Sequence, residues 1–168
     1  HRNCLAAGLA QGFIEPLEAT ALHIVIATAL EFVRACEKGG FTAHYRDEFN
    51  ARAAARFDGI RDYIVAHYRM NQRSGSAYWR DNRANQRLSK SLGAMITAWF
   101  TQGDIAEANA RAYAEPPYSP MSWHALLAGY GTFPELEKLA PLPRGVDDGS
   151  PERVASLLGA CAANFAAL

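Results

Sequence analysis

Residues 3–20 read NCLAAGLAQGFIEPLEAT, and this stretch contains the densest pattern in the sequence. Residues 3–11 are small and apolar, and we expect them to form either a buried strand that passes into a turn or a short buried helix. The Gly-Phe-Ile-Glu-Pro segment that follows interrupts regular structure, and Pro16 suits the first turn of a helix, where no amide hydrogen is needed. A helix is therefore predicted from Glu18 to Glu37, with a lysine and two glycines at its end.

Four further helices are predicted beyond this stretch. Apolar residues that recur every three or four positions indicate amphipathic helices over residues 47–70 and 88–100. The pair Ser119-Pro120, and again Ser150-Pro151, places a capping serine before a proline, and each pair predicts the start of a helix. With about five helices and no convincing strand, the expected fold class is mainly α.

The segments between these helices are predicted to be irregular. Residues 71–87 are polar and are expected to form a loop, and residues 104–117 are expected to be irregular with about one helical turn. No internal repeat and no low-complexity segment is present in the sequence. The length of 168 residues suits one domain, or a partial domain that is one lobe of a larger one, over residues 1–168.

The composition indicates an ordinary globular protein, with 49% hydrophobic residues to build a core. Seventeen basic residues balance 17 acidic ones, so the overall charge gives no indication of nucleic-acid or membrane binding. No stretch is long and apolar enough for a transmembrane helix. Cys4, Cys36 and Cys161 fit no metal motif or disulfide framework, and we expect mostly buried thiols in a reducing cytoplasm.

The start of the first predicted helix is where this sequence could hold an anion. A helix start presents N–H groups without partners and a partial positive charge, so the backbone amides of Thr20 and Ala21 are candidates for holding a small anion. Glu15 and Glu18 lie beside this position, and a carboxylate there could act as a base. Acidic residues in a first helical turn more often serve only to stabilise the helix dipole, and the residues alone favour that interpretation.

The same stretch resembles the flavin-dependent tryptophan halogenase family. Residues 3–20 follow the family pattern Asn-Cys-x-Ala-x-Gly-x-(Ala/Ser)-x-Gly-Phe-x-Glu-Pro-Leu-Glu-(Ser/Ala)-Thr almost without a break. Further matches come in the family's order over about residues 2–135. They are the Arg-Asp-Tyr-Ile-x-x-His-Tyr helix at 61–68, the aromatic pair Tyr78-Trp79, and Ser122-Trp123 with the Gly-Tyr-Gly segment at 129–131.

This resemblance implies the C-terminal helical part of a larger FAD-dependent α/β flavoprotein. Residues 1–37 would supply the flavin and halide segment with its helix, and residues 38–168 a helical region on the substrate side. The family's Gly-x-Gly-x-x-Gly and Trp-x-Trp-x-Ile-Pro motifs and its catalytic lysine are expected before His1. This chain alone is therefore expected to be inactive.

The resemblance also implies a chemistry and roles for particular residues. In the family, chloride or bromide is oxidised with reduced FAD and O2, and the resulting hypohalous acid reaches an electron-rich aromatic substrate such as an indole. A separate flavin reductase supplies the reduced FAD. Glu18 matches the glutamate that stabilises the cationic ring and removes its proton, and Thr20 and Ala21 match the halide site. The residues expected to lie against the flavin are Gly12, Phe13, Pro16, Leu17 and Leu22.

Two departures from the family pattern concern the substrate. Family members that act on free tryptophan carry Ser-Thr-Gly after the glutamate, where residues 19–21 here read Ala-Thr-Ala. The Phe-Trp pair of their amino-acid clamp is missing, and Ser122 stands in place of an asparagine. These departures argue against free tryptophan and leave a carrier-bound substrate or a simpler indole, pyrrole or phenol open. Three aromatic residues are candidates for lining the substrate cavity, although aromatics fill interiors more often: Tyr78, Trp79 and Trp123.

Two other functions remain open on the sequence. One is a flavin monooxygenase of the same superfamily without halide chemistry, and the other is a helical interaction module without catalysis. A homodimer is one possible oligomeric state. The spacing of the histidines matches no metal motif. His23, one turn beyond Glu18, is expected to pack in the core.

Overall fold

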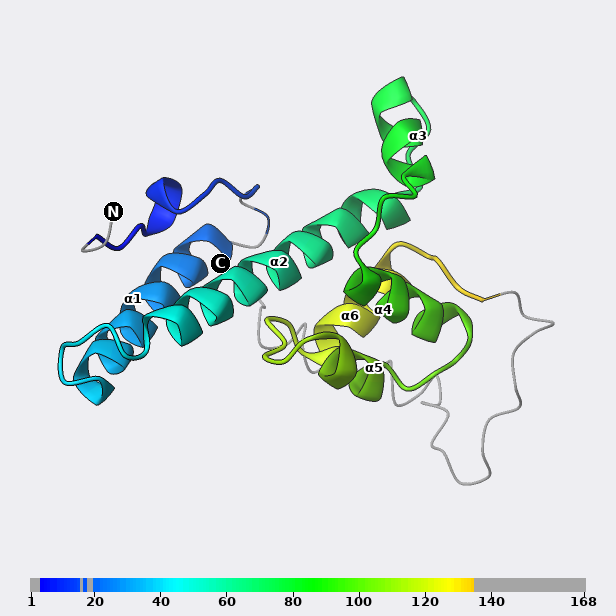
Figure 1. Ribbon diagram of the computed structural model, residues 1–168. Coiled ribbons are helices and arrows are strands. Elements are labelled where there is room, and N and C mark those ends of the chain that lie inside the picture. Colours follow the sequence, from blue (N-terminus) through cyan, green and yellow to red (C-terminus); the bar gives the residue numbers. More distant parts are fainter. Residues whose placement is uncertain (1–3, 16, 18–19, 135–168) are drawn as a thin grey trace, which may run out of the picture. The chain divides into compact units, whose positions relative to one another are not determined.

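The computed structural model describes residues 4–15, 17 and 20–134, and these residues form helices and connecting segments without a strand (Figure 1). The mainly α fold is therefore confirmed. The helix predicted from Ser150 lies outside the described residues. The described elements are the short 3-10 helix η1 (Gly8–Ala10) and the helices α1 (Thr20–Lys38), α2 (Arg46–Met70), α3 (Ala77–Ala84), α4 (Lys90–Phe100), α5 (Ile105–Ala112) and α6 (Pro120–Gly129).

The end of α1 follows from the glycines that the sequence places there. Gly40 has a φ of 58°, which reverses the chain, and the amide of Phe41 donates to the Cys36 carbonyl at 2.8 Å to close the last turn. Phe41 itself has a φ of 59° and is 83% exposed, so an aromatic residue in a left-handed conformation stands in the connection between α1 and α2.

Two segments predicted to be irregular each contain a helix of eight residues, and these predictions were wrong in that respect. Ser76 caps α3 by accepting from the amide of Trp79, and this helix buries none of its residues, so it has no apolar periodicity to reveal it. Asp104 caps α5 by accepting from the amides of Ala106 and Glu107. Its Asp-x-x-Glu pattern resembles a capping box, which is the sequence signal that was available.

The main core lies where the second half of α2 packs with α4, α5 and α6. Ser119 starts α6 as predicted, because its hydroxyl accepts from the amide of Ser122 at 3.2 Å and proline follows it. Trp123 is 1% exposed, and Leu92 and Leu127 are completely buried. Phe100, at the end of α4, is 42% exposed. This part of the chain thus has a packed core of its own, with Phe100 outside it.

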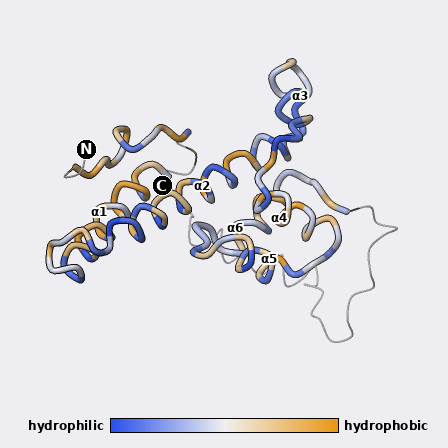
Figure 2. The backbone as a smooth tube through the Cα atoms, viewed as in Figure 1, coloured by the Kyte–Doolittle hydropathy of each residue, from blue (hydrophilic) through white to orange (hydrophobic). Residues whose placement is uncertain are grey.

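Helix α1 packs on α2 through a smaller cluster made by Ile24, Ile60 and Ile64. Part of its apolar surface is not covered by the described residues, and Figure 2 shows hydrophobic colour along α1, in contrast to the hydrophilic α3. We call this surface the open α1 face, and its four residues are each more than half exposed: Leu22, Ile26, Leu30 and Val33.

The segment before α1 also differs from the prediction. Residues 4–7 have no regular structure, η1 follows, and Leu9 is 80% exposed, so this part forms neither a buried strand nor a buried helix. The expectation of buried thiols is wrong for Cys4, which is exposed, while Cys36 is half-buried. His23 is exposed rather than packed in the core. None of the described helices has the length and apolar character needed to span a bilayer.

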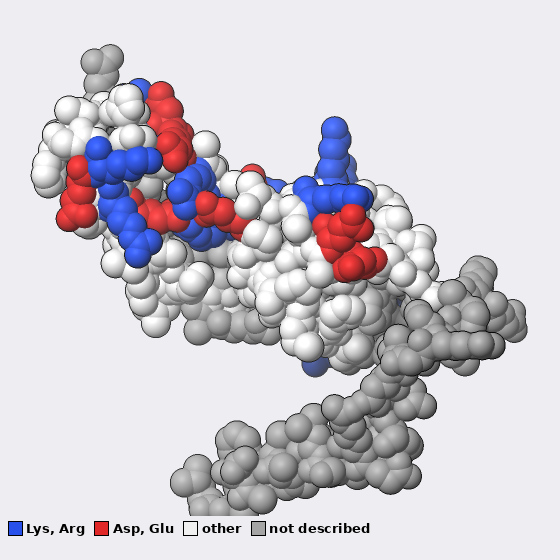
Figure 3. All heavy atoms as spheres, turned by 90° about the horizontal axis from the view of Figure 1, so that it is seen from below, with Lys and Arg blue, Asp and Glu red and all other residues white. Residues whose placement is uncertain are grey.

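An ionic cluster joins α1 to α2. Glu31 accepts hydrogen bonds from Arg56 and, at 3.2 Å, from Arg52, and Glu115 completes the cluster at 2.6 Å from Arg52. The hydrogen bond from Arg56 lowers the pKa of Glu31, and burial opposes that shift. The side chains of Glu31 and Arg56 are only 16% and 12% exposed. Figure 3 shows basic and acidic side chains interleaved in this way on the face in view.

Candidate functional site

The start of α1 is fixed by side-chain hydrogen bonds. Thr20 is 5% exposed, and its hydroxyl donates to the Leu17 carbonyl at 2.6 Å and lies 3.0 Å from the Tyr118 hydroxyl. Thr20 and Ala21 are the first described residues of the helix, and amides in a first turn have no acceptor within the helix. Glu18 and Pro16 lie outside the described residues.

Tyr118 helps to hold the start of α1, and the sequence alone did not reveal this role. Its ring stacks on Tyr63 of α2 with centroids 3.7 Å apart, and Tyr63 in turn donates to the Ser122 carbonyl at 3.1 Å. The segment before α6 is thereby tied to the start of α1. Tyr118 and Thr20 are 98 residues apart in the sequence, so no local pattern could have indicated this contact.

A glycine of α2 lets this segment approach. A Cβ added at Gly59 would lie 2.9 Å from the Pro117 side chain, which is closer than such atoms pack. Pro117 directly precedes Tyr118. The position of Tyr118 therefore depends on the absence of a side chain at position 59.

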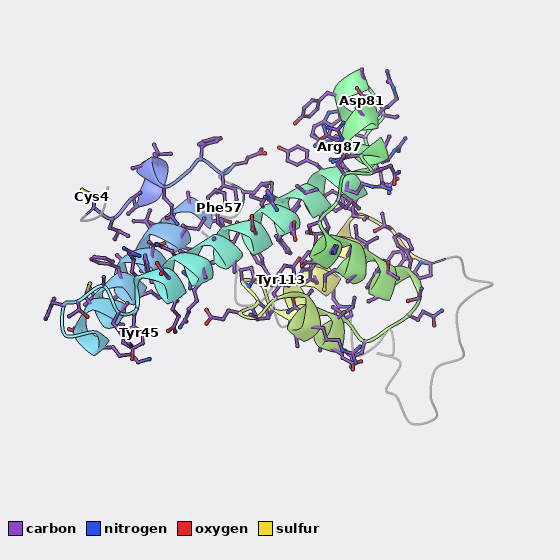
Figure 4. The ribbon with its side chains drawn as sticks, viewed as in Figure 1. Cys4, Tyr45, Phe57, Asp81, Arg87 and Tyr113 are labelled. Atoms are coloured by element: carbon purple, nitrogen blue, oxygen red, sulfur yellow. The ribbon has the colours of Figure 1, made fainter. Side chains whose placement is uncertain are left out.

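A buried carboxylate lies one turn further along α2. Asp62 is 4% exposed and accepts from Ser89 at 2.6 Å and from Tyr113 at 3.2 Å, which connects α2 to the start of α4 and the end of α5. Burial, together with the Asp62 charge, raises the pKa of Tyr113 (labelled in Figure 4). The Asp of the Arg-Asp-Tyr motif thus has a structural role in this fold.

One cavity contains three of the residues predicted to hold the halide and the flavin. It has a volume of about 260 Å³, and its wall includes Gly12, Ala21 and Leu22. Phe57 of α2, which points toward this segment in Figure 4, also lines it, and a Cβ added at Gly12 would lie 3.1 Å from the Phe57 ring. The cavity is mostly apolar and lies against the first turn of α1.

The other predicted flavin residues divide into exposed and packed ones. Phe13 is 76% exposed and Leu22 is 64% exposed, so both present apolar surface. Leu17 instead packs against the cluster of Ile24, Ile60 and Ile64. The described part of the flavin segment therefore has one side held by α2 and one side open.

A second cavity, of about 630 Å³, contains one of the predicted substrate residues. We call it the Trp79 cavity. It lies between the end of α2, the start of α3, the end of α6 and the residues before and after position 16. Its lining residues are Glu15, Leu17, His67, Tyr68, Asn71, Gln72, Arg73, Trp79, Gly129 and Tyr130.

Stacked rings form one wall of the Trp79 cavity. Tyr68 and Trp79 have ring centroids 5.9 Å apart at 19°, and Tyr78 lies edge-on to both. The Tyr68 hydroxyl donates to the Glu15 carboxylate, and this hydrogen bond raises the pKa of Tyr68. Trp123, the third predicted substrate residue, lies in the core against Tyr63 instead.

Metal chemistry has no support in the part of the chain that the structure describes. No group of three or more His, Cys, Asp or Glu side chains there could hold a metal ion. The chemistry that the described residues can provide is anion binding at a helix start, an apolar cradle beside it and an aromatic cavity with charged groups at its ends.

Comparison with known proteins agrees with this arrangement. The tryptophan halogenase family matches residues 1–145. The chain is 36% identical over 120 residues to 7-chloro-L-tryptophan 6-halogenase KtzR of Kutzneria sp. (strain 744), which is 71% of this chain and 23% of that protein. It is 33% identical over 131 residues to tryptophan 6-halogenase SttH of Streptomyces toxytricini, which is 77% of this chain and 24% of that protein.

Comparison with solved structures also finds a halogenase. The fold is similar to that of BrvH, a flavin-dependent halogenase from Brevundimonas sp. BAL3, with a TM-score of 0.72 and 32% identity, covering 98% of this chain and 31% of that one. This chain spans about a quarter of the length of the curated relatives it matches. The family match extends over most of its residues, and the chain therefore belongs to the tryptophan halogenase family.

Proposed function

We propose that this chain is the C-terminal part of a flavin-dependent halogenase that oxidises halide and halogenates an electron-rich aromatic ring. The observation that carries the proposal is the 260 Å³ cavity, which brings Gly12, Ala21 and Leu22 together at the first turn of α1. A helix start attracts an anion, and an apolar wall beside it favours a large, poorly hydrated ion such as chloride or bromide.

The residues present fit a flavin at this position. Gly12 keeps the backbone close to Phe57, and the exposed side chains of Phe13 and Leu22 offer apolar surface to a flat ring. Pro16 and Leu17 complete the segment that would hold it. Reduced FAD, supplied by a separate flavin reductase, would provide with O2 the oxidising power that converts halide into hypohalous acid.

Within this proposal the chain's own residues bind the halide and move a proton. The backbone amides of Thr20 and Ala21 would hold the halide, and the Tyr118 hydrogen bond to Thr20 would keep that helix start in place. Glu18 would stabilise the cationic ring intermediate and remove its proton. The substrate would be an indole or a similar ring, with Trp79 and Tyr78 beside it.

The substrate that we propose differs from the tryptophan in the family's name. KtzR is named as a halogenase of 7-chloro-L-tryptophan and SttH as a halogenase of tryptophan. This chain lacks the Phe-Trp pair of the amino-acid clamp, so we propose a different indole, a pyrrole or a phenol, free or carrier-bound. The chain alone would be inactive, and the full-length enzyme would work in the cytoplasm.

The test uses the full-length enzyme with FAD, a flavin reductase, NADH, bromide and a panel of indoles, pyrroles and phenols. Mass spectrometry would detect the brominated product. Glu18→Gln should lower turnover by about 10²-fold or more, the usual range for losing a general base. Glu37→Gln, an exposed position at the other end of α1, is the matched control and should leave turnover unchanged.

Three results would contradict the proposal. Near-normal turnover of Glu18→Gln would remove this residue from the mechanism. A hydroxylated product with no halide consumed would identify a monooxygenase. No product from any ring would favour a module without catalysis.

A further inference from the structure

Ten of the described arginines fall into two groups, and Arg34 on α1 belongs to neither. Five of them, Arg46, Arg52, Arg56, Arg61 and Arg111, form ion pairs with carboxylates. Between positions 69 and 90 the sequence holds five more arginines and one lysine against a single acid, Asp81, which Figure 4 labels on α3. Within the described residues none of these five arginines pairs with a carboxylate, so the end of α2 and α3 carry an excess of positive charge.

Arg73 is the one member of this second group that lines the Trp79 cavity. Its guanidinium carbon lies 5.1 Å from the centre of the Trp79 ring. Its backbone is held by Asn71, which is 8% exposed and accepts from the Arg73 amide at 2.7 Å. The Arg73 side chain is therefore positioned at the cavity by a ring on one side and a fixed turn on the other.

The cavity has opposite charges at its two ends. Glu15 accepts from Tyr68, Tyr68 stacks on Trp79, and Trp79 lies under Arg73. Two stacked rings thus separate the Glu15 carboxylate from the Arg73 guanidinium. The Glu15 end also contains Leu17, the residue directly before Glu18.

We propose that the Trp79 cavity binds an aromatic substrate that carries a carboxylate on a short chain, with Arg73 holding the carboxylate. This inference rests on the proposed function and names the substrate class. The ring lies along Tyr68 and Trp79 toward Leu17, and Glu15 repels the carboxylate from that end, so the charges allow one orientation. The planar fork of arginine suits a carboxylate, and a volume of 630 Å³ suits a small aromatic molecule.

The first experiment measures binding and does not depend on turnover. The full-length enzyme is titrated calorimetrically with indole-3-propionate and with the neutral compound 3-methylindole. Arg73→Gln should weaken the affinity for indole-3-propionate by about tenfold or more, as expected for a lost charge-assisted hydrogen bond. The affinity for 3-methylindole should not change. Arg73→Lys keeps the charge and should restore part of the affinity.

The control is Arg87→Gln, which removes an exposed arginine of the same run that does not line the cavity. It should change neither affinity. Equal weakening by Arg73→Gln and Arg87→Gln would mean that general charge attracts the ligand, and would overturn the inference. The inference would also be overturned if indole-3-propionate did not bind the wild type, or if it bound Arg73→Gln with the wild-type affinity.

Kinetics then separate this inference from the proposed function. With bromide and reduced FAD, Arg73→Gln should raise KM for indole-3-propionate about tenfold, whereas the control Arg87→Gln should leave KM and kcat for both compounds unchanged. Bromination of both compounds with an unaltered KM in Arg73→Gln would overturn the role of Arg73 alone. Tight binding that depends on Arg73 without any bromination would contradict the proposed function and support the binding site.

Discussion

Two sides of α2 pack in different ways. Around its second half, α4, α5 and α6 bury Trp123, Leu92 and Leu127 almost completely. Of the described residues of α1, which packs on another side of α2, only Thr20, Ile24 and Thr28 are buried, and the open α1 face presents four large apolar side chains to solvent. Contiguous apolar exposure of this kind marks a surface that another structure covers. One region is thus complete as it stands, and the other is suited to an interface.

Substitutions on the two regions should separate them, and Trp123→Ala should have the largest effect. It removes a fully packed side chain and should lower the free energy of unfolding by about 3–5 kcal/mol. Leu22→Ser on the open α1 face should change it by about 0.5 kcal/mol or less, because that side chain is 64% exposed. Urea unfolding of this chain measures both. Similar losses from the two substitutions would show that the open α1 face is covered in this chain, and would remove the contrast.

A glycine pair tests the contact that connects the two regions. Gly59→Ala should lower the free energy of unfolding by about 1–3 kcal/mol, because the new methyl group would crowd Pro117. Gly93→Ala in α4 is the control, since nothing lies within 4 Å of the added atom. It should raise stability by about 0.5–1 kcal/mol through helix propensity. Thermal unfolding distinguishes the two, and a stable Gly59→Ala variant would mean that the Pro117 segment moves freely.

The ionic cluster between α1 and α2 should contribute a smaller, pH-dependent amount. Arg56 lowers the pKa of Glu31, so this group stabilises the fold above its unfolded pKa of about 4.3, and the contribution is lost as the pH falls through the lower folded pKa. Glu31→Gln should cost about 1–2 kcal/mol at pH 7 and almost nothing near pH 2. Urea unfolding at both pH values measures this. A difference that persists in acid would show that the charge of Glu31 is not the cause, and exposed Glu37→Gln should show no difference at either pH.

The sequence predicted the elements that carry their own local signals. Apolar periodicity indicated α2 and α4, and Ser119-Pro120 indicated α6, because both signals depend on neighbouring residues. Helix α3 has only a serine cap and no buried side chain, so periodicity could not find it. Halide and flavin residues came from the family resemblance, and Gly12, Ala21 and Leu22 do line one cavity.

Contacts between distant residues could not be predicted in this way. The hydrogen bond from Tyr68 to Glu15 joins residues 53 positions apart, and Tyr118 reaches Thr20 over 98. Each depends on how α2 packs against two other segments. The same limit applies to burial: His23 was expected in the core and is exposed, because its burial depends on neighbours that the local sequence does not reveal.

Phe41 provides a site for limited proteolysis of the chain. It is an exposed aromatic residue with a left-handed backbone in the connection between α1 and α2. Connections of this kind are preferred sites of proteolytic nicking, and chymotrypsin cleaves after aromatic residues. A brief digestion should therefore release η1 with α1 from the helices that follow, and the open α1 face could then be studied as a separate peptide.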